Sequence, residues 1–233
     1  MFYLNPQYLL FMAPAFLVML LAQWYVKSTY KKWSQVPART RISGAEAAQR
    51  LKSRGGLHDI TIEQVSGNLS DHYDPKKKAL KLSTNVYRGN SVAALAIAAH
   101  ELGHAMQDKE RYLPLRLRSV MVPAVNIGST LGWILIAIGL FIDVIGLAWL
   151  GVIAFSGGAV FALATLPVEL NASARAKQLL KQTGIVQGSQ EQRGVNNVLN
   201  AAALTYVASL FTAVMQLLYW VSVVSGRGSR RRR

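Results

Sequence analysis

Long apolar runs separated by polar segments dominate the pattern of this chain. Four of these runs are long enough to cross a bilayer as a helix, which takes about 20 residues. They cover Tyr8 to Val26, Val120 to Phe141, Val144 to Leu166 and Ala201 to Val224. Asp143 lies in the tight connection between the second and third runs, so these two are expected to form a hairpin. Core helices of a soluble domain rarely show four such runs, and the pattern therefore predicts an integral membrane protein.

The only sizeable polar region lies between the first and second runs, and it reads as a small α+β domain. Ser43 is placed to cap a helix over Gly44 to Ser53. Asp59 to Val65 alternates between apolar and polar residues like a strand, and Ala79 to Leu82 looks like a second short strand. A free strand edge within residues 79 to 86 could pair with an extended polypeptide.

A helix that follows these strands carries a pattern with a clear chemical meaning. Ser91 is placed to cap it, and Val92 to Ala99 consists almost entirely of strong helix formers. His100 and His104 are one turn apart on one face, so both imidazoles can reach a single tetrahedral Zn²⁺. Glu101 lies between them, where its carboxylate can take a proton from water at the metal. This His-Glu-x-x-His pattern is typical of zinc peptidases; the alternative is two helix histidines with core or surface roles.

A third zinc ligand is expected downstream. Zinc peptidases of the glutamate type take it from a second helix, typically as a carboxylate. Past residue 110 the acidic residues are Asp143, in the hairpin turn on the far side of the membrane, Glu191, in a polar segment read as a loop (Gln187 to Gly194), and Glu169. Glu169 begins a helical stretch, Pro167 to Gln182, where the third run leaves the membrane on the side of the histidines. We predict Glu169 as the ligand; the alternative is a charge that favours the helix dipole.

Several segments together carry a family resemblance. The chain resembles the YugP-type neutral zinc metallopeptidases of bacterial membranes, and its layout is similar to that of the HtpX-like membrane proteases, which place a membrane hairpin between the zinc helix and the glutamate helix. The resemblance implies one Zn²⁺ per chain, held by His100, His104 and Glu169, with Glu101 as general base. The segments that carry it are residues 69–75, with the sequence LSDHYDP, Ala98 to Gln107, Leu166 to Ser173, and Ala202 to Ala208.

One position departs from the HtpX-like pattern. Four residues after the ligand glutamate that pattern has aspartate, and this chain has Ser173. The carboxylate that would support a ligand histidine must therefore come from elsewhere, or this contact is weaker. Asn171 could provide part of it.

A hydrolytic mechanism follows from these ligands. Three protein ligands leave zinc an open position for water, whose pKa falls to about 7. Glu101 then takes the proton of the attacking water and delivers it to the leaving amine. The oxyanion needs a further donor, for which the candidates are His72, Tyr73, Arg175 and Tyr206. His72 could equally be a turn residue bonded to Asp74, and Arg175 a basic residue held at the membrane surface.

The composition of the 233-residue chain changes this picture in two ways. A formal charge of +15 would usually suggest nucleic acid or anionic lipid as a partner. With 52% hydrophobic residues and a mean hydropathy of +0.23, lipid is the simpler partner, and we expect no nucleic acid. The chain has no cysteine, which excludes disulfides and cysteine-ligated metal.

Lysine and arginine residues predict the orientation in the membrane. They are numerous within residues 27–118 and absent before the first run, which places the N-terminus outside and residues 27–118 and 167–197 in the cytoplasm. Arg227 and the arginines at 230–233 would then lie outside if the fourth run crosses, against the rule. Either that run does not fully cross, or the earlier helices fix the topology.

The sequence thus predicts a mainly α-helical integral membrane protein with about four transmembrane helices and a small α+β, zincin-like (gluzincin) cytoplasmic domain. We expect a multi-pass zinc metalloendopeptidase of the bacterial inner membrane that cleaves membrane or membrane-proximal polypeptides on the cytoplasmic side, alone, as a homo-oligomer or with a membrane protein partner. The alternative is a non-catalytic scaffold with a structural zinc site, which binds anionic lipid or a partner protein. The expected parts are an N-terminal transmembrane helix (1–26), the cytoplasmic domain (27–118), the hairpin (119–166), a helix with the third ligand and a loop (167–197), a C-terminal transmembrane helix (198–225) and a basic tail (226–233).

Overall fold

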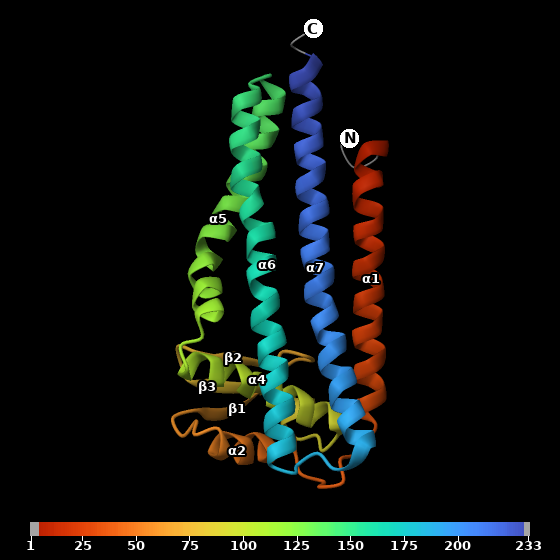
Figure 1. Cartoon of the computed structure of the whole chain (residues 1–233), viewed down its shortest axis with the longest axis vertical. Coiled ribbons are helices and arrows are strands. Elements are labelled where there is room, and N and C mark those ends of the chain that lie inside the picture. The colour runs from red at the N-terminus through yellow and green to blue at the C-terminus, as the bar shows by residue number, and fades with distance from the viewer. Residues whose placement is uncertain (1–4, 231–233) are drawn as a thin grey trace. The chain divides into compact units, whose positions relative to one another are not determined.

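The computed structural model describes residues 5–230, which form mainly helices and one small sheet (Figure 1). The chain divides into two compact units. Among the described residues, a helical unit contains residues 5–22, 117–166 and 205–230, and a mixed unit contains residues 23–116 and 167–204. The elements are α1 (Pro6–Ser34), α2 (Gly44–Arg54), β1 (Thr61–Val65), β2 (His72–Asp74), β3 (Ala79–Ser83), α3 (Thr84–Tyr87), α4 (Val92–Lys109), α5 (Leu113–Phe141), α6 (Ile145–Gln182) and α7 (Gly188–Arg230).

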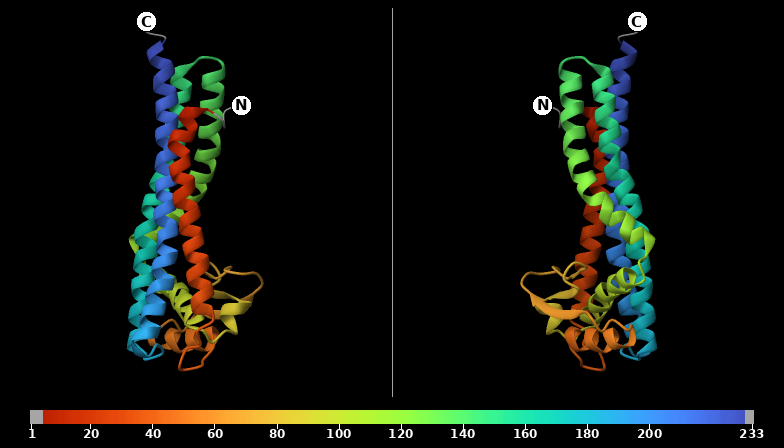
Figure 2. Two further views of the ribbon diagram at one scale, coloured as in Figure 1. Left: turned by 90° about the vertical axis from the view of Figure 1, so that its right-hand side faces the viewer. Right: turned by 90° about the vertical axis from the view of Figure 1, so that its left-hand side faces the viewer.

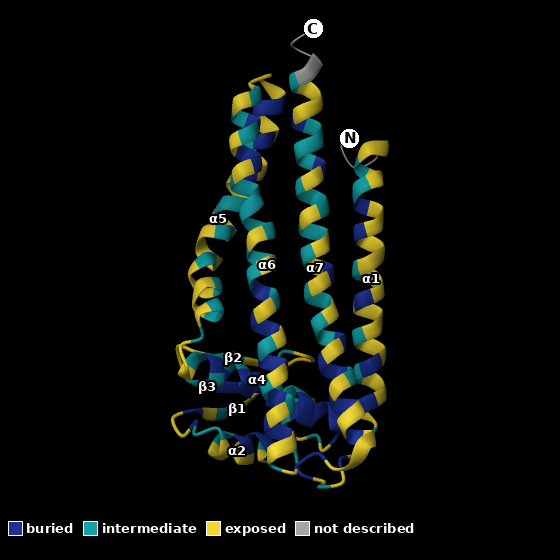
Figure 3. Ribbon diagram, in the orientation of Figure 1, coloured by how far each residue is buried: buried dark blue, intermediate teal, exposed yellow. Residues whose placement is uncertain are grey.

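Four helices, α1, α5, α6 and α7, have the length and apolar composition needed to cross a membrane. Each contains one of the four predicted runs, so the prediction that these runs form helices long enough to cross a bilayer is confirmed. Many residues of these helices are exposed (Figure 3), and large apolar residues are among them, as expected where lipid replaces water as the solvent. Phe141, for example, is 90% exposed and Val120 is 75% exposed.

Small residues bring α5 and α6 together in the predicted hairpin. A Cβ atom at Gly132 of α5 would lie 2.8 Å from the carbonyl oxygen of Gly151 of α6. A larger residue would force the two backbones apart, which is why glycine is common where membrane helices meet.

One end of the helical unit gathers three parts of the chain. Arg227 Nη1 near the end of α7 donates to the Leu140 carbonyl oxygen at the end of α5, over 3.1 Å. At the start of α1, Gln7 Nε2 donates to Ser222 Oγ over 2.9 Å, and the Tyr8 and Tyr219 rings lie 5.1 Å apart. Arg227, near the end of α7, therefore lies at the end of this unit where the hairpin turns and α1 begins.

The mixed unit packs a small sheet against α2 and α4 (Figure 2). The strand order is β1-β3-β2, with β1 parallel and β2 antiparallel to the central strand β3. Its core includes the fully buried side chains of Leu51, Leu80, Leu82, Leu95 and Leu102. The helix predicted after Ser43 is confirmed, because Ser43 Oγ accepts from Glu46 N while Glu46 reaches back to Ser43 N as a capping box.

Two local predictions are wrong. Strand β3 is the central strand and not an edge, since it pairs with β1 over residues 79–83 and with β2 over residues 79–81; β1 and β2 are the two edge strands. The polar segment from Gln187 to Gly194 is not a loop, since α7 begins at Gly188. Glu191 in its first turn is only 3% exposed and accepts from the backbone N–H groups of Arg39 and Gln187, each over 2.7 Å.

Candidate metal centre

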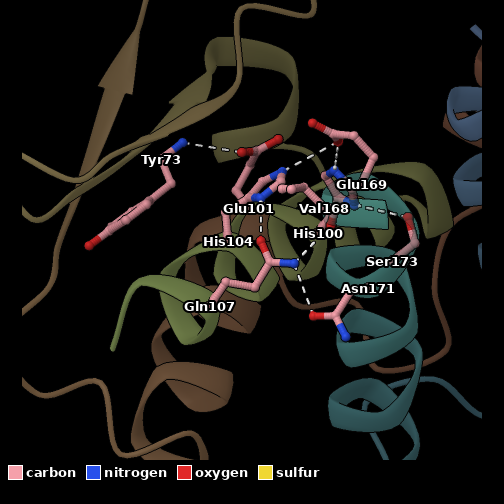
Figure 4. Close-up of polar contacts among 9 residues, drawn as sticks. All are labelled: Tyr73, His100, Glu101, His104, Gln107, Val168, Glu169, Asn171 and Ser173. Atoms are coloured by element: carbon pink, nitrogen blue, oxygen red, sulfur yellow. Dashed lines mark hydrogen bonds and ion pairs between the residues drawn. The ribbon is translucent and has the colours of Figure 1, made fainter. Parts of the chain in front are cut away.

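Helix α4 and the part of α6 that belongs to the mixed unit supply the clustered side chains (Figure 4). Helix α4 starts as predicted, with Ser91 Oγ accepting from Ala94 N over 3.2 Å, and carries His100 and His104 one turn apart. Helix α6 continues through Pro167 and carries Glu169, which is 2% exposed. The predicted helical stretch that begins at Pro167 is therefore part of the helix that precedes it.

The three predicted ligands come together in this structure. Glu169 Oε2 lies 3.3 Å from His100 Nε2 and 3.5 Å from His104 Nε2. One ligand atom from each of the three residues lies within 4.8 Å of the other two. Two imidazole nitrogens and one carboxylate oxygen make up a donor set used by catalytic zinc sites.

The charges at this cluster favour a cation between the side chains. Burial on its own would lower the pKa of His104, but the hydrogen bond to Glu169 and the charges of Glu101 and Glu169 raise it on balance. An imidazole nitrogen and a carboxylate oxygen both present lone pairs, so they approach closely only around a proton or a metal ion. The residues present therefore fit a zinc ion.

Glu101 is held beside the cluster by the sheet. Its side chain is buried, and its Oε2 accepts from the backbone N–H of Tyr73 on β2 over 3.1 Å. The Tyr73 hydroxyl donates to Asp108 Oδ2 over 2.8 Å, which ties the same strand to the end of α4. The edge strand thus orients the carboxylate that was predicted to act as general base.

The two other predicted catalytic residues, His72 and Arg175, are bonded to groups outside the cluster of His100, His104 and Glu169. His72 is exposed on β2, and its Nδ1 lies 2.8 Å from the Ser70 carbonyl oxygen rather than bonding to Asp74. Arg175 Nη1 donates to Glu110 Oε1 over 2.7 Å, and its guanidinium lies 5.9 Å from the centre of the Tyr112 ring. Within residues 5–230, no hydrogen bond or ion pair joins either side chain to the three clustered groups.

A polar side chain lies against each histidine: Ser173 against His100 and Gln107 against His104. The sequence prediction gave Gln107 no role. Ser173 Oγ lies 3.2 Å from His100 Nδ1, so a hydroxyl occupies the place of the aspartate in the HtpX-like pattern. Gln107 Oε1 lies 3.0 Å from His104 Nδ1. The signal for Gln107 was its place one helical turn after His104, where two side chains on a helix meet.

Comparisons with known proteins agree with this chemistry. The family model described as "Putative neutral zinc metallopeptidase" matches residues 8–225. The chain is 44% identical over 207 residues to "Putative membrane protease YugP" of Bacillus subtilis (strain 168), covering 88% of this chain and 92% of that protein. No solved structure matches the chain significantly.

Proposed function

Since the chain belongs to the neutral zinc metallopeptidase family, we propose that it is a membrane-embedded zinc endopeptidase that cleaves membrane or membrane-proximal polypeptides. The four long apolar helices support a place in the bilayer, and the family supports a peptide or protein substrate. The single observation that carries the proposal is the meeting of His100, His104 and Glu169 with Glu101 held alongside on the same helix as the histidines.

Each residue of the cluster has a role in this proposal. His100, His104 and Glu169 hold one zinc ion, which when bound supplies Lewis-acid chemistry by lowering the pKa of water and polarising a carbonyl oxygen. Glu101 takes a proton from the attacking water and returns it to the leaving amine. The Tyr73 N–H fixes the direction of the Glu101 carboxylate, so the base does not have to be ordered during the reaction.

The oxyanion that forms during hydrolysis needs a hydrogen-bond donor. His72 is exposed next to Tyr73 on the edge strand, so we retain it as the candidate that a polypeptide lying along β2 would meet. Arg175 is engaged by Glu110 and Tyr112, and we assign it a different role below.

A substitution at Glu101 tests the assignment. Glu101→Gln keeps the size of the side chain and leaves the three ligands intact, so the variant should bind zinc like the wild type. It should no longer cleave an unfolded substrate such as casein, because an amide cannot take up the proton. Glu63→Gln is the matched control, since Glu63 is exposed on β1 and bonds only locally to Thr61.

The same assay separates an enzyme from a scaffold. Unchanged cleavage by Glu101→Gln would refute the assigned base. A wild-type protein that holds zinc tightly and yet cleaves neither casein nor peptides would favour a structural zinc site in a non-catalytic membrane scaffold.

A further inference from the structure

Gln107 is a fully buried polar side chain with every hydrogen-bonding atom engaged. Its exposed fraction is 0%, and its Nε2 donates to the Val168 carbonyl oxygen over 2.8 Å and to Asn171 Oδ1 over 3.0 Å. A carbonyl oxygen can only accept, so the NH₂ end of the amide must face Val168. The oxygen end is therefore the one that faces His104.

The side chain of Asn171, the next residue outward, is also oriented by its partners. Asn171 Oδ1 accepts from Gln107 Nε2 and also from Arg175 Nε, the latter over 2.7 Å. A guanidinium only donates, so the oxygen of Asn171 must be the atom between these two donors. Arg175 is fixed in turn by Glu110 and by the Tyr112 ring.

We propose that Gln107, Asn171 and Arg175 are positioning residues that hold His104 in its metal-binding form. Because Gln107 Oε1 can only accept, His104 Nδ1 must carry the proton that joins them, and Nε2 of the neutral ring is left with a lone pair. Nε2 is the atom that faces Glu169. This inference rests on the proposed function, since it assigns His104 to zinc.

The arrangement acts on one histidine only. His100 Nδ1 faces the hydroxyl of Ser173, which can donate or accept and so does not select between the two forms of the ring. The row of hydrogen bonds from Arg175 through Asn171 and Gln107 to His104, here called the relay, joins α6 to α4 through partly buried and buried groups. It therefore also fixes the direction of the His104 ring relative to Glu169.

Two substitutions at Asn171 test the relay with zinc binding as the readout. Asn171→Asp keeps an oxygen that accepts from both Gln107 and Arg175, whereas Asn171→Leu has a similar size and accepts nothing. Zinc affinity, measured on the full-length protein in detergent by competition with a chelator, should fall by about 10- to 100-fold in Asn171→Leu, as for other partners of ligand histidines. Asn171→Asp should stay within about threefold of the wild type.

The control is an asparagine of the same unit that is remote from the relay. Asn200 on α7 accepts from Lys177 Nζ over 2.9 Å, so Asn200→Leu removes a similar bond and should leave zinc affinity unchanged. Equal zinc affinity in Asn171→Leu and wild type, or equal losses in Asn171→Leu and Asn171→Asp, would overturn the inference. The proposed function itself would be overturned if the wild-type protein did not bind zinc, or if replacing His100 left zinc affinity unchanged.

A second variant tests the outer end of the relay. Arg175 and Asn171 line a cavity of about 360 Å³, which gives small ions access to this end. Arg175→Ala should weaken zinc binding, and millimolar guanidinium ion should restore it by occupying the vacated space, while the same concentration of sodium chloride should not. A loss that guanidinium leaves unchanged in a folded Arg175→Ala protein would contradict the role of Arg175.

Discussion

The backbone of Gly103 on α4 lies directly against the backbone of Ala172 on α6. A Cβ atom at position 103 would clash with the Ala172 carbonyl oxygen and lie 3.0 Å from its carbonyl carbon. Gly103 precedes His104, and Ala172 lies one helical turn after Glu169. The close approach of these two backbones therefore sets the distance between the histidines and the carboxylate.

Gly103→Ala should disturb both stability and metal binding. The added methyl group must push α6 away from α4, at a cost of about 1–3 kcal/mol in the free energy of unfolding. Zinc affinity should fall with it, because Glu169 moves with α6. Gly146→Ala is the control, since a Cβ there meets nothing within 4 Å. A Gly103→Ala protein with wild-type unfolding temperature and zinc affinity would show that the helix contact does not position the ligands.

Glu169 and Glu191 are both buried carboxylates, and they should respond differently to the same change. Glu169→Gln should lose bound zinc in metal analysis, as His104→Ala should, because an amide oxygen is a poorer ligand than a carboxylate. Glu191→Gln should keep its zinc but lose about 1–3 kcal/mol of stability, since its carboxylate accepts two backbone N–H groups. Retention of zinc by Glu169→Gln would remove it from the ligand set.

Ser173 offers a test of how strongly His100 is supported. Ser173→Ala leaves His100 Nδ1 without its hydroxyl partner and should weaken zinc binding by about tenfold. Ser173→Asp provides a charged acceptor and should bind zinc at least as tightly as the wild type. Ser156→Ala, which removes a hydroxyl bonded only to the Ile153 carbonyl oxygen, serves as the control. If Ser173→Asp binds more weakly than Ser173→Ala, the cost of burying the charge exceeds the gain of the bond.

The absence of cysteine makes the orientation easy to test with single-cysteine variants. We expect Val144→Cys, at the hairpin turn, and Ser225→Cys, near the end of α7, to react with a membrane-impermeant maleimide in intact cells. Ser53→Cys on α2 should react only after the cells are permeabilised, because residues 27–118 carry the basic residues that favour the cytoplasm. Labelling of Ser53→Cys in intact cells would reverse the orientation, and different labelling of the other two would contradict the Arg227–Leu140 contact.

Much of the fold could be predicted because its signals are local. The apolar runs identify all four long helices, and Ser43 and Ser91 mark helix starts through caps that depend only on nearby backbone. The ends of the long helices were not predictable from hydropathy, since α1 continues to Ser34 and α7 begins at Gly188, in polar sequence. Helical hydrogen bonds continue past the apolar stretch as long as the backbone finds partners there. Strand β2 has three residues, too few to show an alternating pattern.

The candidate site also has parts that local sequence predicts and parts that it does not. Its chemistry could be read from the spacing of His100, Glu101 and His104, because a helix places residues four apart on one face. The role of Tyr73 depends on which group another element brings to it, and sequence spacing carries no information about that. The spacing does place Gln107 one helical turn after His104, but the bonds of Gln107 to Val168 and Asn171 depend on the position of α6. Tyr73 acts through its backbone N–H, a group that every residue except proline possesses, so its identity gave no signal.

The passage of the chain through the hairpin before it reaches Glu169 has a consequence for biosynthesis. A ribosome releases the two histidines first, and the carboxylate follows only after both hairpin helices have been translated. An unfinished chain therefore carries two of the three proposed zinc ligands. The proposed metal site is complete only after both hairpin helices have been made, so under this proposal a partly synthesised chain is inactive.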